Sequence, residues 1–206
     1  MAGWTRDGLG EPSGDLLRVP TRRTWGRGAF GEANGTVVDG DDVGMGRESV
    51  QRLAWGDVYR SLRLAGRSGS LAGEDLEVLA AAAYLLGHVE ECRQALQRGH
   101  RAYLAAHNPQ RAARCLFWVA FTLLLEGHLA PADGWLARAR RVIGPEEREC
   151  PEQGLFLLPD AVLAGGAGDF ATCEDVAARA AEIGARSGDA DLLSLALHFQ
   201  GRAMVR

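Results

Sequence analysis

The chain has 206 residues, of which 47% are apolar and 24% are charged, and this composition is ordinary for a globular protein. Its net charge of −4 and its pI of about 5.8 argue against a general electrostatic attraction to nucleic-acid phosphates. No apolar signal region opens the chain, and the longest apolar run, residues 115–125, is well short of the roughly 20 residues that a bilayer span requires. We therefore expect a cytoplasmic protein that binds neither nucleic acid nor a membrane directly.

The first 46 residues form a glycine-rich segment. They hold eleven of the 27 glycines of the chain and show the hydrophobic periodicity of neither a helix nor a strand. This composition predicts a disordered tail over residues 1–46, with at most short helical fragments near Leu16 and Leu17. The predicted folded domain then covers residues 47–206.

Residues 26–31 of this tail match the nucleotide-binding spacing G-x-G-x-x-G. A dinucleotide-binding fold requires a strand before this motif and a helix after it, and neither residues 21–25 nor the segment broken by Gly35 provides one. A kinase or a Walker-type loop would also require a lysine, which the chain lacks. We therefore expect no cofactor.

From Glu48 onward, helix-forming residues with periodic apolar positions are interrupted by recurring turn signals. The signals recur at intervals of roughly 30 to 40 residues, and repeats of this length are typical of solenoids built from helical hairpins. At each turn a glycine can adopt a left-handed conformation without steric cost and so end a helix. The turn signals are Gly56-Asp57, Gly87-His88, Gly127-His128 and Gly168-Asp169.

Apolar and small residues recur at the same distances from the last three turns. In the third hairpin Ala132, Leu136 and Ala139 are spaced i, i+4, i+7, which places them on one helix face. Small side chains at such a face let two antiparallel helices approach closely, and neighbouring hairpins cover the remaining apolar surface. We expect an all-α, right-handed solenoid of antiparallel helix hairpins. The recurring positions before the turns are Leu76, Leu79, Ala80 and Ala83; Leu116, Val119, Ala120 and Leu123; and Leu157, Ala161 and Ala164.

The fourth hairpin resembles the tetratricopeptide repeat, whose pattern is a Gly-Asp-aromatic turn followed by small residues at helical spacing. Residues 168–170 supply the turn, and Cys173, Ala177 and Ala180 supply the small positions. The sequence departs from the pattern elsewhere. His88 and His128 replace the usual Asp or Asn, Gly99 stands where Ala is normal, Pro159 interrupts a helix, and the repeat at Gly56 with Ser61 is weak.

A narrower resemblance covers about residues 50–206. Residues 85–88, 134–141 and 187–192 are similar to the repeat region of actinobacterial LuxR-type transcriptional regulators. In that family the repeats precede a C-terminal helix-turn-helix, so the resemblance implies a sensory or scaffolding part that regulates transcription without its DNA-binding domain. The repeat register assigns Gly201 and Met204 to a first helix, so the last predicted repeat is truncated. We interpret the chain as a fragment of a longer protein, or as a protein whose last helix is covered by another chain.

First helices of stacked hairpins line a concave surface, and this surface is the predicted binding site. Its expected ligand is a protein or peptide, which includes a homodimer partner or a missing C-terminal effector domain. The competing interpretation is that the same residues pack between helices, because residues 115–125 are apolar on every side. The predicted groove residues are Tyr84, Arg114, Phe117, Phe121, Leu158, His198 and Arg202.

An alternative function is a stand-alone ligand- or metal-responsive sensor that uses cysteine and histidine. Cys92 and Cys173 occupy small packing positions, Cys115 lies in the apolar run, and no C-x-x-C or H-x-x-x-H pair occurs, so no metal site is predicted. Cys150 is the one candidate for an exposed reactive thiol. Trp135 is interpreted as a packing residue. Because no nucleophile or acid–base motif is recognisable, we expect no enzymatic activity.

Overall fold

The computed structural model describes residues 40–51, 54–68, 71–144 and 150–205. The chain divides into two compact units, Met1–Thr36 and Val37–Arg206, and every described residue belongs to the second unit. Most of the predicted tail, including Leu16, Leu17 and the glycine motif at residues 26–31, lies outside the described residues.

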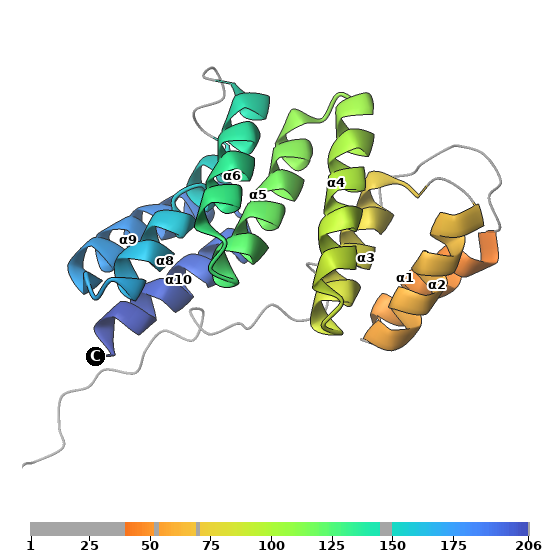
Figure 1. The fold of residues 1–206 in the computed structure, drawn as a ribbon, viewed down its shortest axis with the longest axis horizontal. Helices are drawn as coiled ribbons and strands as arrows, with labels where there is room; N and C mark the ends of the chain where they lie inside the picture. The colour runs from red at the N-terminus through yellow and green to blue at the C-terminus, as the bar shows by residue number, and fades with distance from the viewer. Residues whose placement is uncertain (1–39, 52–53, 69–70, 145–149, 206) are drawn as a thin grey trace, which may run out of the picture. The chain divides into compact units, whose positions relative to one another are not determined.

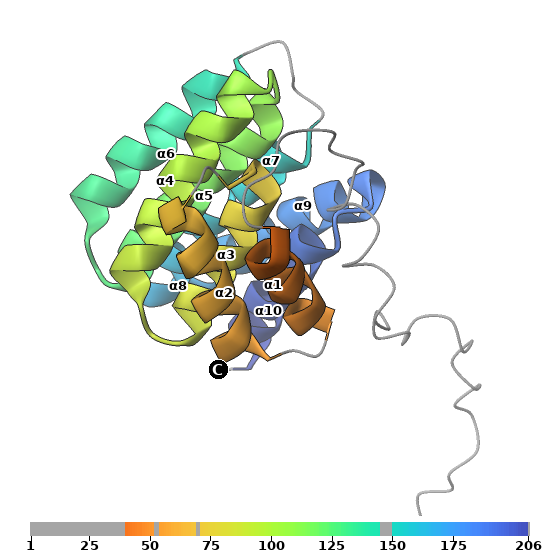
Figure 2. The same ribbon diagram turned by 90° about the vertical axis from the view of Figure 1, so that its right-hand side faces the viewer.

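The described residues are helical almost throughout and contain no strand, which confirms the predicted all-α class. The helices pack in neighbouring pairs, α1 with α2, α3 with α4, α5 with α6, and α9 with both α8 and α10 (Figure 1). Contacts of α2 with α3 and of α4 with α5 join successive pairs (Figure 2). None of the described helices combines the length and the apolar character that crossing a bilayer demands. The bounds are α1 (Gly40–Gln51), α2 (Trp55–Ser68), α3 (Gly73–Leu85), α4 (Val89–Ala105), α5 (Pro109–Leu125), α6 (Leu129–Ile143), α7 (Pro151–Leu155), α8 (Leu158–Gly166), α9 (Phe170–Ser187) and α10 (Ala190–Met204).

Three of the predicted turns share one backbone conformation. Gly87, Gly127 and Gly168 have φ angles of +81°, +83° and +81°. The N–H of the residue after each glycine donates to the carbonyl oxygen of the fifth residue before it. The donor–acceptor distance is 2.8 Å for His88 to Ala83, after Gly87, and 2.9 Å after each of the other two glycines. This bond closes the end of each preceding helix. The positive φ explains why glycine occupies all three positions.

The turn predicted at Gly56-Asp57 is wrong. Both residues lie in the first turn of α2, which begins at Trp55, whereas α1 already ends at Gln51. Asp57 suits a helix start because an acidic side chain interacts favourably with the positive end of the helix dipole. The interval from Gly56 to Gly87 is also shorter than the intervals between the later turn glycines, which is consistent with Gly56 lying in a helix and not in a turn.

The domain boundary predicted between residues 46 and 47 falls inside α1, which begins at Gly40 and packs against α2. Gly44 and Gly46 lower the helix propensity of this segment, so its sequence resembles the tail before it. Packing explains the helix, because Gly46 is buried and a Cβ at this position would approach the Leu62 side chain to 3.0 Å. Residues 40–46 therefore belong to the helical domain.

Pro159 separates two short helices, as the sequence predicts. It occupies the first turn of α8, where its missing N–H removes no helical hydrogen bond. Two short helices, α7 and α8, therefore precede α9 in place of one long helix, and both pack against α9.

The buried apolar residues form two clusters that meet on α5. Ala112, Cys115 and Val119 face the cluster built largely from α2, α3 and α4. Leu116 and Phe117 belong to the cluster that continues through α6 to α10. Because α5 is buried on nearly every side, it joins the two cores and orients the polar side chains at its own N-terminal half.

Candidate functional site

Three of the predicted groove residues are core residues. The exposed fractions of Phe117, Phe121 and Leu158 are 0%, 5% and 0%. Phe117 and Phe121 stack on one another with ring centroids 5.3 Å apart, and all three belong to the C-terminal core cluster. The prediction that they line an open groove is therefore wrong. The competing interpretation, packing between helices, is the one that the structure supports.

Three other predicted residues are exposed but do not form one site. Tyr84 is 44% exposed at the end of α3, whereas His198 and Arg202 lie one helical turn apart on the surface of α10. Arg202 forms no ion pair with any described residue, and the His198 ring packs edge-on against Phe199 beside it. The seven residues therefore split between the core, the α3 surface and the α10 surface.

Arg114 is the seventh residue, and it is the centre of a buried ionic cluster. Its guanidinium binds the Asp189 carboxylate through both terminal nitrogens, with Nη2 to Oδ1 at 3.1 Å. Nη2 also lies 3.3 Å from Asp191 Oδ2, and Nη1 lies 3.8 Å from Glu152 Oε1. Only 9% of the Arg114 side chain is exposed. The cluster ties α5 to α7 and to the start of α10.

This cluster is rich in negative charge, since three carboxylates surround one guanidinium. Burial acts to raise the pKa of Asp189, but the Arg114 hydrogen bond and the Leu192 and Asp191 backbone N–H groups lower it by more. Glu152 is 3% exposed, and its Oε2 atom has no hydrogen-bond partner among the described residues. Because an unsatisfied buried acceptor is costly, Glu152 is the least satisfied member of the cluster.

A second polar cluster lies between α3, α4 and α5. Glu77 Oε2 accepts hydrogen bonds from Arg111 Nη2 at 2.6 Å and from the Tyr103 hydroxyl at 3.1 Å, and the Cys115 thiol lies 3.8 Å from Oε1. Burial raises the pKa of Glu77, although Arg111 and Tyr103 act in the opposite direction. The pKa of Tyr103 is also raised, first by burial and then by the Glu77 charge. The cluster fastens the second hairpin to the third.

The cysteines are placed largely as the sequence predicts. Cys92, Cys115 and Cys173 are buried and free, and burial raises the pKa of Cys92 to about 11. Cys150 is half-buried, and burial together with Glu152 raises its pKa, so its reactive thiolate form is disfavoured. No group of three His, Cys, Asp or Glu side chains among the described residues could hold a metal ion.

Trp135 packs as predicted. It is partly buried against both core clusters, and the Arg138 guanidinium lies 5.5 Å from its ring centroid. Pro131, Gly134 and Arg138 complete an open depression of about 240 Å³ beside the ring. These residues bring few polar groups together there, so the depression gives little basis for orienting a small ligand.

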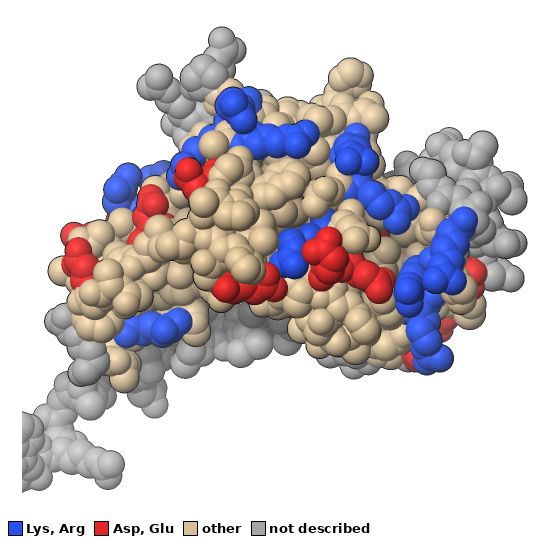
Figure 3. Space-filling model, in the orientation of Figure 1, with Lys and Arg blue, Asp and Glu red and all other residues tan. Residues whose placement is uncertain are grey.

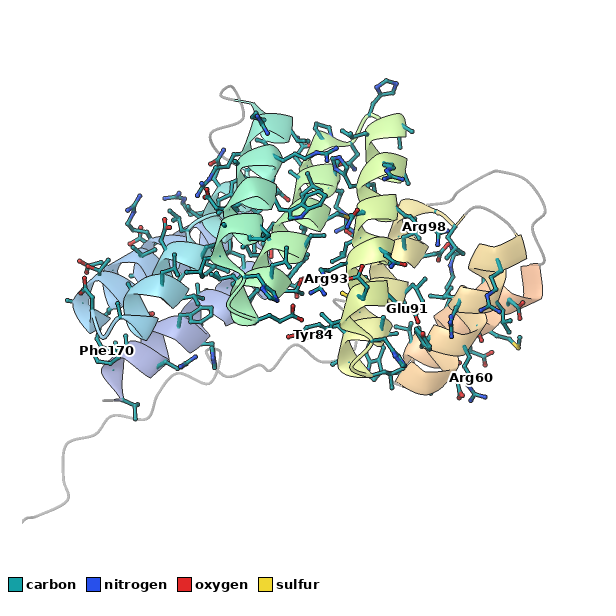
Figure 4. The ribbon with its side chains drawn as sticks, in the orientation of Figure 1. Arg60, Tyr84, Glu91, Arg93, Arg98 and Phe170 are labelled. Atoms are coloured by element: carbon teal, nitrogen blue, oxygen red, sulfur yellow. The ribbon has the colours of Figure 1, made fainter. Side chains whose placement is uncertain are left out.

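Large apolar side chains remain exposed at two neighbouring turns. Tyr84 and Leu85 lie at the end of α3 and Leu86 follows it, while Leu125 and Leu129 flank the Gly127 turn. The exposed fractions of these five side chains lie between 42% and 59%. These five residues are called the turn edge below. Arg93 reaches from α4 to Glu126 at 2.9 Å and bridges the two turns (Figure 4). On the face shown in Figure 3, arginines lie among carboxylates and a broad area carries neither.

Sequence reasoning missed the partners of Arg114. Asp189 lies 75 residues away along the chain, and nothing in the local pattern around either residue indicates the pairing. A partial signal was present, because Asp189 precedes a helical pattern and is typical of an N-cap residue. Its side chain does accept the Leu192 N–H at 2.9 Å.

Comparisons with known proteins find no matching family model, no matching curated protein and no matching solved structure.

Proposed function

We propose that this chain is a protein-interaction and regulatory module built from tetratricopeptide-like hairpins in a right-handed solenoid. One observation carries the proposal: three turns share the same positive-φ glycine and the same closing hydrogen bond, and their spacing along the chain is nearly constant. Repeated hairpins of this kind generate extended surfaces that suit polypeptide ligands better than small molecules. In cells the module would act in the cytoplasm.

The resemblance of residues 85–88, 134–141 and 187–192 to LuxR-type regulators supports a role in transcription. In this proposal the chain is the sensory or scaffolding part, and DNA binding belongs to a helix-turn-helix encoded with it. The genomic DNA after the Arg206 codon tests this role. A helix-turn-helix in frame, or after a single frameshift, is expected. A stop codon followed by unrelated sequence would remove the LuxR-type assignment.

The turn edge is the best candidate for the contact surface. Exposed apolar patches that exceed a few hundred Å² are uncommon on monomeric proteins and often mark contact sites. Five large apolar residues from two adjacent hairpins are exposed at this edge, around the Arg93–Glu126 ion pair. This surface includes Tyr84 and takes the place of the predicted groove, whose residues Phe117, Phe121 and Leu158 are buried.

A complementation experiment in the source organism tests the regulatory role and the turn edge together. Deletion of the gene should change transcription of its target genes, and the native chain should restore it. The variant Leu125→Glu/Leu129→Glu should fail to restore transcription although it folds. Leu104→Glu, which changes a 44%-exposed leucine outside the edge, is the matched control and should succeed. Unchanged transcription after deletion would refute the regulatory role, and full complementation by the double variant would refute the edge.

The alternative function, a ligand or metal sensor that uses cysteine, has less support, because three of the four thiols are buried and burial raises the pKa of Cys150.

A further inference from the structure

The open depression beside Trp135 lies on one face of α6. Its lining residues, Pro131, Gly134, Trp135 and Arg138, are spaced i, i+3, i+4, i+7, which places them on one side of the helix. Trp135 packs in part against both core clusters and in part lines the depression. Gly134 adds space, because a Cβ at this position would meet no atom within 4 Å. The packed part of the tryptophan therefore holds its remaining surface in place beside an open space.

Two arginines lie on the same side of the fold as this depression. The Arg138 guanidinium is 5.5 Å from the Trp135 ring centroid. Burial lowers the pKa of His100 on α4, and the charges of Arg138 and Arg101 lower it further, so both guanidinium groups lie near this buried ring. Both arginines are exposed, and neither forms an ion pair with any described residue. The surface next to Trp135 is therefore positively charged.

This charge is part of a wider pattern in α4 and α6, which both pack on α5. Residues 92–105 and 134–143 hold six arginines and no aspartate or glutamate, although the net charge of the chain is −4. The carboxylates lie near the beginnings of the two helices, with Glu90 and Glu91 in the first turn of α4 and Glu126 just before α6. In Figure 3 arginine predominates along the upper edge of the face, where α4 and α6 end, and acidic side chains lie nearer their beginnings.

Some of these arginines are explained by the fold itself. Arg140 and Arg141 lie in the last turn of α6, where a cation interacts favourably with the helix dipole. Arg140 also donates to the Phe156 backbone oxygen at 3.1 Å. Neither explanation applies to Arg101 or to Arg138, which lie before the last turns of their helices. Their charges are therefore available to a ligand.

The size and the charge of the site narrow the class of ligand. Its volume of about 240 Å³ is below the roughly 300–1,000 Å³ that is usual for small-molecule pockets, so it suits one side chain of a polypeptide better than a free small molecule. Tryptophan and arginine are also enriched among the residues that dominate the binding energy of protein interfaces. The two guanidinium groups favour an acidic partner, because complementary charge directs association.

Nucleic acid is the main competing ligand, since bases stack on tryptophan and phosphates pair with arginine. A nucleic-acid strand carries a charge at every nucleotide, however. The carboxylates near the beginnings of α4 and α6 would repel the strand where it continues beyond the depression. A short acidic segment of a protein avoids this repulsion.

We propose that the depression beside Trp135 binds a short acidic segment of another protein, with one bulky apolar side chain against the Trp135 ring and carboxylates paired with Arg138 and Arg101. The depression and these two arginines are called the Trp135 patch below. The inference rests on the proposed function in that the ligand is a polypeptide, and it adds a contact surface separate from the turn edge.

A phage library of short random peptides, selected on the full chain, is the probe. The enriched peptides should carry an excess of aspartate and glutamate together with an aromatic residue or proline. The most enriched peptide is then synthesised with fluorescein, and its Kd is measured by fluorescence anisotropy. Arg138→Glu and Trp135→Ala should each weaken binding by about tenfold or more, because they change the charge and the ring at the centre of the contact.

Arg98→Glu is the matched control. Arg98 is an exposed arginine of α4 without an ion pair to any described residue, and it lies on the side of α4 that faces α2 (Figure 4). The charge change is the same as in Arg138→Glu, yet the affinity should fall by about twofold or less, since salt screens a charge outside the contact. Circular dichroism checks that each variant folds. Arg138 is exposed, so Arg138→Glu tests the site even where Trp135→Ala disturbs the packing.

A further control separates this surface from the turn edge. The variant Leu125→Glu/Leu129→Glu should bind the selected peptide as tightly as the native chain does. Loss of binding in that variant would place the peptide on the turn edge and overturn the inference, whereas the complementation experiment would be unaffected. The Trp135 patch and the regulatory role can therefore fail separately.

Four other outcomes would overturn the proposal. The first is a selection that enriches no peptide, or only peptides without an excess of acidic residues. The second is equal peptide affinity for the native chain and for Arg138→Glu. The third is displacement of the peptide by an equal concentration of single-stranded oligothymidine, since nucleic acid would then be the better ligand. The fourth is a dimer, measured by light scattering, that Arg138→Glu dissociates, since a second copy would then occupy the patch.

Discussion

Arg111 and Arg114 lie one turn apart on α5, and each binds a carboxylate from another part of the chain. The Arg111 partner, Glu77, has a raised pKa, whereas the Arg114 partner, Asp189, has a lowered one. Burial acts to raise the pKa of both carboxylates, and at Glu77 it is the dominant cause, whereas at Asp189 the hydrogen bonds to the carboxylate lower the pKa by more. A cationic neighbour alone is therefore insufficient to fix the pKa of a carboxylate.

The second source of stabilisation at Asp189 is the helix that it caps. Asp189 accepts backbone N–H groups at the start of α10 in addition to both terminal nitrogens of Arg114. Glu77 lies inside α3, whose backbone N–H groups are already used, so it depends on side-chain donors. Hydrogen bonds to the ionised form outweigh desolvation at Asp189 but not at Glu77. The C-terminal cluster is thus the better satisfied ion pair, although it carries the unpartnered Glu152 oxygen.

The largest expected effect comes from removing the two arginines in turn. Arg114→Met leaves buried carboxylates without their counter-charge and should lower the free energy of unfolding by about 3–5 kcal/mol. Arg111→Met, the matched control, breaks a pair whose side chains are 35% and 22% exposed, and should cost about 1 kcal/mol or less. Urea denaturation followed by circular dichroism measures both. Equal losses would contradict the contrast between the clusters.

A second variant tests whether the close approach of α9 and α10 positions Asp189. A Cβ at Gly184 would lie 2.8 Å from the Leu193 backbone nitrogen, so Gly184→Ala must shift α10. We expect a loss of about 1–3 kcal/mol from overpacking. Gly134→Ala, in a helix position with nothing within 4 Å, should instead gain about 0.5–1 kcal/mol. A neutral Gly184→Ala would mean that the two helices separate without cost.

Helix capping separates the two roles of Asp189. Asn108 caps α5 through its side-chain oxygen at 3.0 Å from the Arg111 nitrogen and carries no charge. Asn108→Ala should cost about 1 kcal/mol, the ordinary value of a cap. Asp189→Ala removes both a cap and the Arg114 partner, so its thermal or urea denaturation should show a larger loss. If the two losses match, Arg114 contributes nothing through Asp189.

The smallest effect is a pH dependence of opposite sign for the two carboxylates. Because the pKa of Glu77 is raised, its contribution to stability is full below the unfolded value near 4.5 and is lost as pH rises through the folded pKa. Because the pKa of Asp189 is lowered, its contribution is full above the unfolded value near 3.8 and is lost as pH falls through the folded pKa. The checks are urea titrations between pH 7 and 3.

Two conservative variants assign these effects. Glu77→Gln should remove the gain in stability on mild acidification. Asp189→Asn, which keeps a capping side chain, should reduce the loss in more acidic solution. A Glu77→Gln curve parallel to that of the native chain would show that Glu77 has an ordinary pKa.

Much of the helical framework could be predicted because its signals are local. A glycine that must adopt a positive φ marks a helix end wherever it occurs, so Gly87, Gly127 and Gly168 were found correctly. The packing roles of Cys92, Cys173 and Trp135 followed from helical spacing. The turn at Gly56 was wrongly predicted because a Gly-Asp pair suits the first turn of a helix as well as a turn between helices. In the structure α2 begins at Trp55, so Gly56 and Asp57 lie inside the helix.

The candidate surfaces could be predicted only in part, since exposure depends on what covers a residue. Phe117 in α5 and Leu197 in α10 are both apolar residues with helical spacing, yet Phe117 is fully buried and Leu197 is 52% exposed. Periodicity identifies an apolar face but contains no information on whether another helix lies against it.

The sequence by itself determined the all-helical class, three turns, the break at Pro159 and the faces of the helices, because each depends on backbone preferences and spacing within a few residues. Only the tertiary structure decided that Arg114 is buried against Asp189, that residues 40–46 join the helical domain, and that Phe117 is buried in the core. Each of these depends on contacts between segments far apart in the chain, and the energy of such contacts leaves no trace in local sequence.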